Sequence, residues 1–574
     1  MTTDNRSFLP DSSTAWHFFC FLLALTAVFY QLGTLPLMAP DEGRNAEVAR
    51  EMYQTGQWLV PLYNGAPYLD KPAFYFRTVA LGYDLLGVSE FAARFSSALF
   101  AFGLLGLVYA FCRRVYSRTL AATAVATVAA MPLFMAFSRI VIFDMTLAFF
   151  VCAAIFSGYL AEMQQEKRWY LLTAAGSGVA TLVKGPVGFI LPTLVLVLFN
   201  LWQGPPRGYM GRMFHWKHWL VFLALVLPWF VGLSMACPDF PYYGIMKESV
   251  ARFTTKEFHR TAPFYYYGLI ILTGCFPLCL LLPQAALHAI RQRRFLAAPD
   301  RLLIVWCIAV IVFFSLSQSK LPGYILTAVV ALGILIARVF EKSWQEGQNT
   351  ALRMVRQGTL AFGFLSTTLA IACFLVMAHP EWLGAYLRAE VVHDLKPLLP
   401  HLTLSWVGLA AFSLMSLVKK RPRVHFMAFM LVPLLILTIN FPLFEVHARH
   451  KTGKTLASQV ATLVPDNTTL VCVQCFPNGM AFYLQRTLHV VTSEGGEFTS
   501  NYIPYYLKGH QDWPDSFIRP EAFAAWLKQQ PRPVYIMAGA SALASMQVLQ
   551  AAEQGKLTPL VDGSWLLELP LRGM

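Results

Sequence analysis

The chain has 574 residues, of which 56% are hydrophobic and only 13% are charged. A soluble globular protein carries about 25% charged residues, so this composition excludes an ordinary soluble enzyme. The formal net charge is +14, yet the stretch from residue 444 onward holds ten Lys and Arg against ten Asp and Glu. The positive excess therefore belongs to the apolar part of the chain, as in the cytoplasmic loops of a membrane protein, and no nucleic-acid partner is expected.

Apolar runs recur from Trp16 almost to Phe444. Each run of about 20 residues is long enough to cross a hydrocarbon core about 30 Å thick, so we predict about thirteen membrane spans. The first run is too long for the apolar segment of a cleavable signal peptide and is predicted to be retained. The predicted spans lie near residues 15–36, 79–111, 119–137, 145–163, 168–183, 186–202, 219–236, 264–290, 302–318, 323–340, 358–378, 402–418 and 426–443.

Basic loops set the predicted orientation. With the N-terminus in the cytoplasm, the inner loops contain the basic clusters at residues 113–118, 291–294 and 419–423, as the positive-inside rule requires. The odd number of spans then places residues 444–574 outside the cytoplasm, where alternating strand-like and helical runs predict a small α/β domain. The predicted fold class is an all-α polytopic membrane domain, residues 1–443, followed by this soluble domain. Its predicted strands are residues 469–476, 488–492, 534–538 and 565–569.

The first outer loop, about residues 37–78, is unusually long and carries Asp41, Glu42 and Arg44 near its start. The residues after Pro40 follow a helical pattern that predicts an amphipathic helix lying along the membrane surface. Asp41 has two interpretations, because aspartate is a favoured N-cap and a carboxylate at this place could also serve catalysis. Glu42 could either complement the helix dipole or contact a substrate.

Tyr68, Asp70 and Lys71 stand just before the second span, among aromatic residues. They fit an interfacial ion pair within an aromatic belt. They also fit a lysine that is held at the outer rim to receive a phosphate group. The sequence leaves these two interpretations open.

Asp144 lies at the predicted outer mouth of the fourth span, after Arg139 and with no basic residue adjacent to it. Ionisable groups near membrane depth are costly and usually serve function. A carboxylate without an adjacent partner therefore predicts a functional residue rather than a solvated turn.

Further cations stand in outer segments that carry no net positive excess. Each alone could be an anchor that reaches the interface. Together they predict an anion site in an outward-facing cavity, with His259 and Tyr324 beside two of them. These cations are Lys71, Lys184, Arg252, Arg260 and Lys320.

Cys472 and Cys475 form a CxxC motif inside the strand-like run at residues 469–476. Residues three apart on a strand point to opposite faces. We therefore predict that these cysteines pack in the core and do not form a redox or metal site.

The order of these motifs along the chain resembles the GT-C glycosyltransferases that use polyprenyl-phosphate sugars. The chain is most similar to the ArnT family of bacterial aminoarabinose transferases and, more distantly, to protein O-mannosyltransferases. The resemblance covers essentially the whole chain. It implies a GT-C fold in the bacterial inner membrane, an active site facing the periplasm, and transfer of 4-amino-4-deoxy-L-arabinose from undecaprenyl phosphate to lipid A phosphate groups.

The resemblance also implies roles for individual residues. Asp41 and Asp144 would be the two catalytic carboxylates. Lys71 and Arg252 would bind the carrier phosphate, with Tyr324 lining the pocket beside it. The other residues expected to bind substrate are Glu42, Arg44, Tyr68, Asp70, Arg139, Lys184, His259, Arg260 and Lys320.

One departure concerns a metal. The family commonly has Glu-Lys where this chain has Asp70-Lys71, and a His where Glu248 and Ser249 stand. We therefore expect no required cofactor, with a divalent metal near Asp70 as the open alternative. The expected partners are the undecaprenyl-phosphate sugar donor, the acceptor and the bilayer, and the protein is expected to be a monomer.

Two alternatives to lipid A modification stay open. A related transferase could act on another envelope glycan, lipid or protein hydroxyl, in which case Asp41 would be the base that deprotonates the acceptor. A flippase or transporter of lipid-linked sugars would share the anion cavity. However, it predicts polar residues through the bilayer midplane and often an internal repeat, and the sequence shows neither pattern.

Overall fold

The computed structural model describes residues 12–570 apart from 205–208, 256–259, 292–295, 345–349, 419–421 and 532. The candidate His259 lies outside the described residues. Contacts divide the chain into two compact units. Unit 1 comprises residues 1–32, 97–228 and 249–446, and unit 2 comprises residues 33–96, 229–248 and 447–574. The units therefore do not follow the predicted linear boundary at residue 444, because the first outer loop packs with the C-terminal region.

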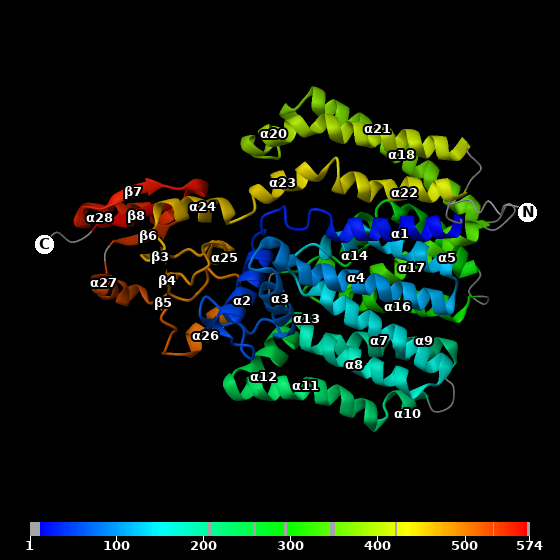
Figure 1. Ribbon diagram of the computed structural model, residues 1–574, viewed down its shortest axis with the longest axis horizontal. Coiled ribbons are helices and arrows are strands. Elements are labelled where there is room, and N and C mark those ends of the chain that lie inside the picture. The colour runs from blue at the N-terminus through cyan, green and yellow to red at the C-terminus, as the bar shows by residue number, and fades with distance from the viewer. Residues whose placement is uncertain are drawn as a thin grey trace, which may run out of the picture. The chain divides into compact units, whose positions relative to one another are not determined.

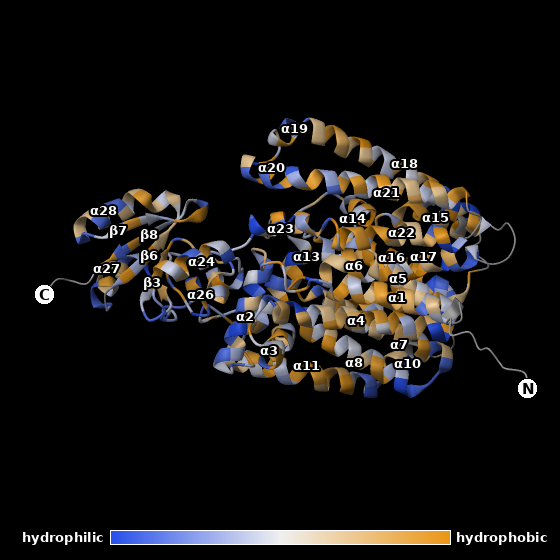
Figure 2. Ribbon diagram, turned by 45° about the horizontal axis from the view of Figure 1, so that its top comes forward, coloured by the Kyte–Doolittle hydropathy of each residue, from blue (hydrophilic) through white to orange (hydrophobic). Residues whose placement is uncertain are grey.

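Unit 1 is a bundle of apolar helices, which Figure 2 colours mainly as hydrophobic residues. Its neighbouring helices α7, α8 and α9 lie side by side in Figure 1. The elements of unit 1 are α1 (Ser12–Phe29), α5 (Arg118–Ala129), α6 (Pro132–Phe137), α7 (Asp144–Gln164), α8 (Lys167–Lys184), α9 (Val187–Gln203), α10 (Tyr209–Met213), α13 (Arg252–Thr254), α14 (Tyr266–Gly274), η2 (Leu278–Leu281), α15 (Leu282–Arg291), α16 (Ala298–Leu316), η4 (Pro322–Ile325), α17 (Leu326–Ser343), α18 (Thr350–Ala378), α19 (Glu381–Gly384), α20 (Ala389–Leu395), η5 (Lys396–Leu398), α21 (Leu399–Val418) and α22 (Pro422–Leu437). Four elements run from one unit into the other: α4 (Glu90–Val115), α11 (Trp216–Ala236), η1 (Tyr243–Ala251) and α23 (Phe441–Arg449).

The prediction of an all-α polytopic membrane protein is confirmed. Among the described residues, seven helices are long and apolar enough to cross a membrane, or up to nine if two bent helix pairs each form one span. The prediction of about thirteen spans also counted shorter apolar helices such as α5 and α9. At 1.5 Å per residue, the twelve residues of α5 cover only about 18 Å of a hydrocarbon core about 30 Å thick.

Unit 2 contains the predicted α/β domain. Its six-stranded sheet has the order β5-β4-β3-β6-β8-β7, in which β5, β4, β3 and β6 are parallel and β8 and β7 are antiparallel additions. Buried aliphatic residues such as Val471, Ile536 and Leu567 form its core. The strands are β3 (Thr469–Val473), β4 (His489–Val491), β5 (Phe517–Ile518), β6 (Val534–Ala538), β7 (Lys556–Pro559) and β8 (Trp565–Leu569), and the helical elements are α24 (Lys454–Leu463), α25 (Met480–Leu484), α26 (Tyr502–Gly509), α27 (Pro520–Gln529), η6 (Ala540–Ala542), α28 (Leu543–Glu553) and η7 (Val561–Gly563).

The predicted helix of the first outer loop exists, but its predicted surface position is wrong. This helix, α2 (Asp41–Thr55), is buried at every residue from Glu42 to Met52. Its polar side chains are covered because they bond to other parts of unit 2, as Arg44 does to Thr499. The same segments of unit 2 hold β1 (Leu62–Tyr63), β2 (Ala66–Pro67), α3 (Phe74–Leu86) and α12 (Phe240–Tyr242).

Candidate functional site

Asp144 and Lys184 lie at the ends of two neighbouring antiparallel helices in unit 1 (Figure 1). Asp144 is the first residue of α7, and Lys184 is the last residue of α8. The helix dipole favours a carboxylate at the first end and a cation at the second. The Lys184 ammonium donates a hydrogen bond of 2.5 Å to Asp144 Oδ1, and the two side chains are only 13% and 6% exposed. The pair is therefore a buried charge pair that the helix ends help to stabilise.

Two aromatic rings cover the Lys184 ammonium. Its Nζ lies 4.5 Å from the centroid of the Tyr324 ring and 5.0 Å from that of Phe143. Such cation–π contacts are strongest where water is excluded. Gly323 lets the η4 turn approach, because a Cβ there would lie 3.0 Å from Asp144 Cγ. A carboxylate, an ammonium and a phenol ring thus meet in a small space.

Asp144 has no basic residue adjacent to it in the sequence, yet it has a basic partner in the structure. Its partner Lys184 is 40 residues away in the sequence. A local reading of the residues around Asp144 could not find it, because the pairing depends on α7 and α8 packing side by side. Lys184 had been expected to contribute to an outward anion site and Asp144 to be a catalytic carboxylate, and the structure brings both together with Tyr324.

Arg139 and Lys320, both expected to bind substrate, are engaged with backbone groups. Arg139 donates to the carbonyl of Tyr30 at 2.5 Å and to that of Ala27 at 3.3 Å, where α1 ends. These bonds satisfy carbonyl groups that a helix end leaves open. The Lys320 ammonium donates to the Ser317 carbonyl at 2.6 Å. Both contacts fit structural roles.

The remaining candidates of unit 1 lie on the segment after η1. Arg252 opens the short helix α13 and is half-buried. Arg260 is exposed, and its backbone carbonyl accepts a hydrogen bond from the Lys320 amide at 3.0 Å. Their roles in phosphate binding stay predictions.

A second polar cluster, in unit 2, surrounds Lys71. The Lys71 ammonium donates to Glu248 Oε2 at 2.6 Å and also bonds to the Asp70 backbone carbonyl. Glu248 Oε1 accepts a hydrogen bond of 3.1 Å from the Asn501 side-chain amide. The interpretation as a Lys71–Asp70 ion pair is wrong, since the acid that neutralises Lys71 is Glu248.

Asp70 itself holds the start of helix α26. Its carboxylate accepts the Asn501 and Tyr502 backbone N–H groups at 3.0 and 2.9 Å, and the Tyr243 hydroxyl at 3.0 Å. A carboxylate at a helix N-terminus satisfies N–H groups that the helix leaves open. The Asp70 carboxylate is buried at 6% exposure.

A divalent metal near Asp70 does not fit these contacts. Both oxygens of Asp70 face N–H or O–H donors, and the nearby acid Glu248 faces the Lys71 ammonium. Within the part of the chain that the structure describes, no group of three or more His, Cys, Asp or Glu side chains could hold a metal ion. That the protein requires no cofactor stays a prediction.

Asp41 does not cap helix α2. The N-cap position is Pro40, which makes no side-chain cap bond. The Asp41 carboxylate instead pairs with Arg44 at 2.5 Å, and Arg44 also donates to Thr499. The Arg44 guanidinium lies 5.9 Å from the centroid of the buried Tyr68 ring. The Asp41 side chain remains 47% exposed and is free to meet a ligand.

Glu42 is fully occupied by structural bonds. Its two oxygens accept hydrogen bonds of 2.9 Å from Arg94, and one also accepts the Met38 backbone N–H at 3.0 Å. Arg94 and Glu42 are both buried, at 2% and 3% exposure. This pair fastens α2 to α4, so the expected contact of Glu42 with substrate finds no support in its geometry.

Sequence reasoning missed the residues that complete these clusters. Glu248 was noted only as a departure from the family, and Tyr243, Thr499 and Asn501 were not singled out. They reach the first outer loop from positions 173 to 455 residues away in sequence. The one signal in the sequence for an acidic partner of Lys71 was Glu248, which stands in a segment where the candidate residues are cations.

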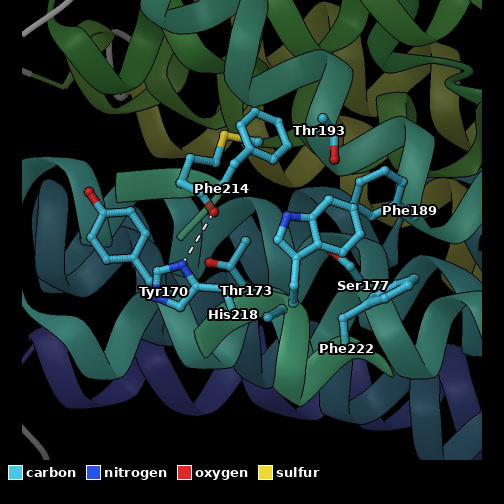
Figure 3. A pocket seen from close by; sticks show the side chains of 11 residues that line it. Tyr170, Thr173, Ser177, Phe189, Thr193, Phe214, His218 and Phe222 are labelled. Atoms are coloured by element: carbon cyan, nitrogen blue, oxygen red, sulfur yellow. Dashed lines mark hydrogen bonds between the residues drawn. The ribbon is translucent and has the colours of Figure 1, made fainter. Parts of the chain in front are cut away.

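A separate apolar cavity lies in unit 1 among α8, α9, α10 and α11 (Figure 3). Its volume is about 50 Å³, and it is lined by aromatic rings such as Phe189, Trp219 and Phe222. His218, in its wall, is hydrogen-bonded to the Met213 carbonyl at 3.2 Å. None of the eleven described side chains that line it is a carboxylate or a Lys or Arg. The described lining of this cavity therefore offers phosphate no Lys or Arg, and the candidate chemistry stays with the polar clusters.

Comparisons with known proteins identify a family and a related fold. The profile of the Dolichyl-phosphate-mannose-protein mannosyltransferase family matches residues 18–243. The fold matches the crystal structure of ArnT from Cupriavidus metallidurans bound to undecaprenyl phosphate with a TM-score of 0.81, at 23% identity and over 97% of this chain and 98% of that one.

Two curated relatives carry the same name, undecaprenyl phosphate-α-4-amino-4-deoxy-L-arabinose arabinosyl transferase. The protein from Shewanella sediminis is 27% identical over 88% of this chain and 90% of its own length. The protein from Erwinia tasmaniensis is 31% identical over 68% of this chain and 71% of its own length. This chain is a membrane glycosyltransferase and belongs to the family of undecaprenyl phosphate-aminoarabinose arabinosyl transferases.

Proposed function

We propose that this chain transfers 4-amino-4-deoxy-L-arabinose from undecaprenyl phosphate to a phosphate group of lipid A, at the periplasmic face of the bacterial inner membrane. The names of its relatives support the donor. The basic inner loops support the orientation. The observation that carries the proposal is the buried pair of Lys184 and Asp144 under the Tyr324 ring.

The chemistry of transfer explains why such a pair is needed. The bond between the anomeric carbon and the carrier phosphate oxygen breaks, and an acceptor phosphate oxygen bonds to the same carbon. Negative charge grows on the leaving phosphate, and a cation already fixed in place stabilises it more than the ground state. Lys184 supplies that cation, and Asp144 stabilises the positive charge that develops on the sugar. A phosphate acceptor is already nucleophilic, so this reaction needs no general base.

The test is transfer by the purified protein in lipid nanodiscs. The donor is undecaprenyl-phosphate aminoarabinose, and the acceptors are lipid A and lipid A without its phosphates. Mass spectrometry should show one added aminoarabinose on phosphorylated lipid A only. Asp144→Asn should remove this product, whereas Asp84→Asn, the same change at an exposed position of α3, should keep it. Transfer to the dephosphorylated acceptor would instead establish a hydroxyl acceptor.

A further inference from the structure

Only Cys472 of the CxxC motif lies in strand β3, so the prediction that the two cysteines point to opposite sides of one strand does not hold. Strand β3 ends at Val473, and Gln474 takes a left-handed conformation with φ of 50°. This turn takes Cys475 out of the strand, so the alternation of faces along β3 no longer separates its side chain from that of Cys472. A non-glycine residue with positive φ is uncommon and often marks a functional constraint.

The motif occupies the switch point of the parallel sheet. From β3 the chain continues to β4 and β5 on one side, and then returns to β6 on the other side of β3. In open parallel sheets, functional groups gather at the carboxyl ends of the strands where the order reverses. Cys475 follows β3 at this edge, and its thiol donates to the Met537 carbonyl of β6 at 3.7 Å.

The two thiols differ in their surroundings. Cys472 is fully buried, whereas Cys475 is partly exposed. The hydrogen bond from the Cys472 thiol lowers the pKa of Cys475 below its ordinary value, although burial and the charge of Glu497 oppose the shift. An accessible thiol with an enhanced thiolate fraction beside a second, buried thiol is the arrangement of an attacking and a resolving cysteine.

We propose that Cys472 and Cys475 are a reversible dithiol–disulfide site whose co-reactant is a disulfide-bearing oxidant. The Cys475 thiolate attacks one sulfur of the oxidant, which forms a mixed disulfide and releases one thiol. Cys472 loses its proton and attacks the Cys475 sulfur, which forms the Cys472–Cys475 bond and releases the second thiol. Two protein thiols and one disulfide thus give one protein disulfide and two thiols. The compartment outside the cytoplasm, where the orientation proposed above places this domain, supplies such an oxidant. The dithiol site itself does not depend on transferase activity.

The motif adjoins the segment that supports α2. Three residues after Cys475, the Asn478 side-chain oxygen accepts hydrogen bonds from Tyr63 at 3.2 Å and Thr499 at 3.1 Å. The next residue, Gly479, packs directly against Gly43 of α2. A disulfide fixes the turn at Gln474 and so steadies this contact. Oxidation should therefore raise the unfolding temperature of the protein.

The test uses the full-length protein in nanodiscs, equilibrated with mixtures of reduced and oxidised glutathione. The protein is quenched in acid, alkylated and digested with trypsin. The tryptic peptide at residues 455–486 holds Cys472 and Cys475 and no other cysteine. It should be lighter by two hydrogens and unalkylated under oxidising mixtures, and alkylated at both cysteines under reducing ones. Thermal unfolding at the same mixtures gives the second readout.

Variants separate the site from general effects of oxidation. Cys475→Ser should make the unfolding temperature independent of the glutathione ratio while preserving the fold, because Cys475 is only partly buried. Cys237→Ser removes another partly buried cysteine of unit 2 and should leave the redox response unchanged. A wild-type peptide alkylated at both cysteines at every ratio would overturn the proposal. So would a glutathione adduct on one cysteine in place of the internal disulfide.

Discussion

Lys184 at the end of α8 neutralises Asp144 at the start of α7 across 2.5 Å, although 40 residues separate them in the sequence. Each charge also meets the favourable end of its helix dipole. The pair can therefore hold its geometry before substrate arrives. This preorganisation is what a site needs if it is to stabilise charges that develop during transfer.

Variants of the Asp144–Lys184 pair should show different effects on stability and on transfer activity. Asp144→Asn leaves Lys184 buried without its charge partner, and breaking a buried pair costs about 3 kcal/mol. Asp144→Asn combined with Lys184→Gln should regain most of this stability, because no lone charge remains. Both proteins should lose transfer by about 100-fold or more. Thermal unfolding and donor turnover measure the two effects, and an active double variant would make the pair purely structural.

Lys71 and Glu248 should affect donor binding in opposite directions. If Lys71 binds the carrier phosphate, Lys71→Gln should weaken undecaprenyl-phosphate binding about tenfold, which corresponds to about 1.4 kcal/mol. Glu248→Gln should strengthen binding, because it removes the carboxylate that neutralises Lys71. Affinity is measured in nanodiscs at low salt. Lys508→Gln, in an exposed ion pair of the same unit, is the control. Weaker binding by both Lys71→Gln and Glu248→Gln would indicate a structural pair.

Asp41 should be sensitive to any loss of charge. Its side chain pairs with Arg44 but is 47% exposed, so the pair is worth at most about 1 kcal/mol. Replacement by Ser, Asn or Ala should therefore leave the unfolding temperature near that of wild type and remove transfer. Asp41→Glu should retain partial activity, since it keeps the charge. Transfer by Asp41→Ser at close to the wild-type rate would exclude a catalytic role.

Much of the fold follows from local sequence patterns. The apolar runs place the helices of unit 1, and the β-rich runs place β3, β4, β6 and β8 within a few residues. The two-residue strand β5 is too short to leave a pattern. The prediction that α2 lies along the membrane surface was wrong because the polar residues of this helix bond within unit 2. Amphipathic periodicity does not distinguish such bonds from contact with water.

The site was predictable only in part. Asp144 and Lys184 could be placed on the same side of the membrane, because loops alternate between the two sides. Their pairing could not be predicted, since it depends on which helices are neighbours. Glu248 and Asn501 complete the Lys71 cluster from distant segments. No local pattern reports such long-range contacts.

Gly43 should be intolerant of a side chain. A Cβ at Gly43 would lie 2.7 Å from both the Cα and the N of Gly479, so two backbones would have to separate. Overpacking of this kind costs about 1–3 kcal/mol. Gly43→Ala should lower the unfolding temperature and, by moving α2, reduce transfer. Gly496→Ala, at a position in unit 2 with open space around it, should change neither. Normal stability of Gly43→Ala would show that this contact is easily relaxed.

Glu51 should make unit 2 less stable as the pH rises. Its buried carboxyl accepts the Asn64 and Gly65 backbone N–H groups and lies near Glu47, which pairs with Arg50. Burial, together with the negative charge of Glu47, raises the pKa of Glu51 from 4.5 to about 8. The folded state therefore binds the proton more tightly than the unfolded state does. The stability that this proton contributes is full below about pH 4.5 and is lost as the pH rises through about 8.

The measurement is the unfolding temperature of the purified protein from about pH 6 to about pH 9. The wild-type value should fall across this range, since a tenfold difference in proton affinity between the two states corresponds to about 1.4 kcal/mol. The side chain at this position cannot titrate in Glu51→Gln, so the unfolding temperature of this variant should fall clearly less than that of wild type. The unfolding temperature of Glu521→Gln, a change at an exposed position of α27, should fall as that of wild type does, because this change leaves Glu51 and its contacts intact. Equal slopes for wild type and Glu51→Gln would mean that Glu51 is ionised in the folded protein throughout the range, held so by the two backbone N–H groups and Arg50.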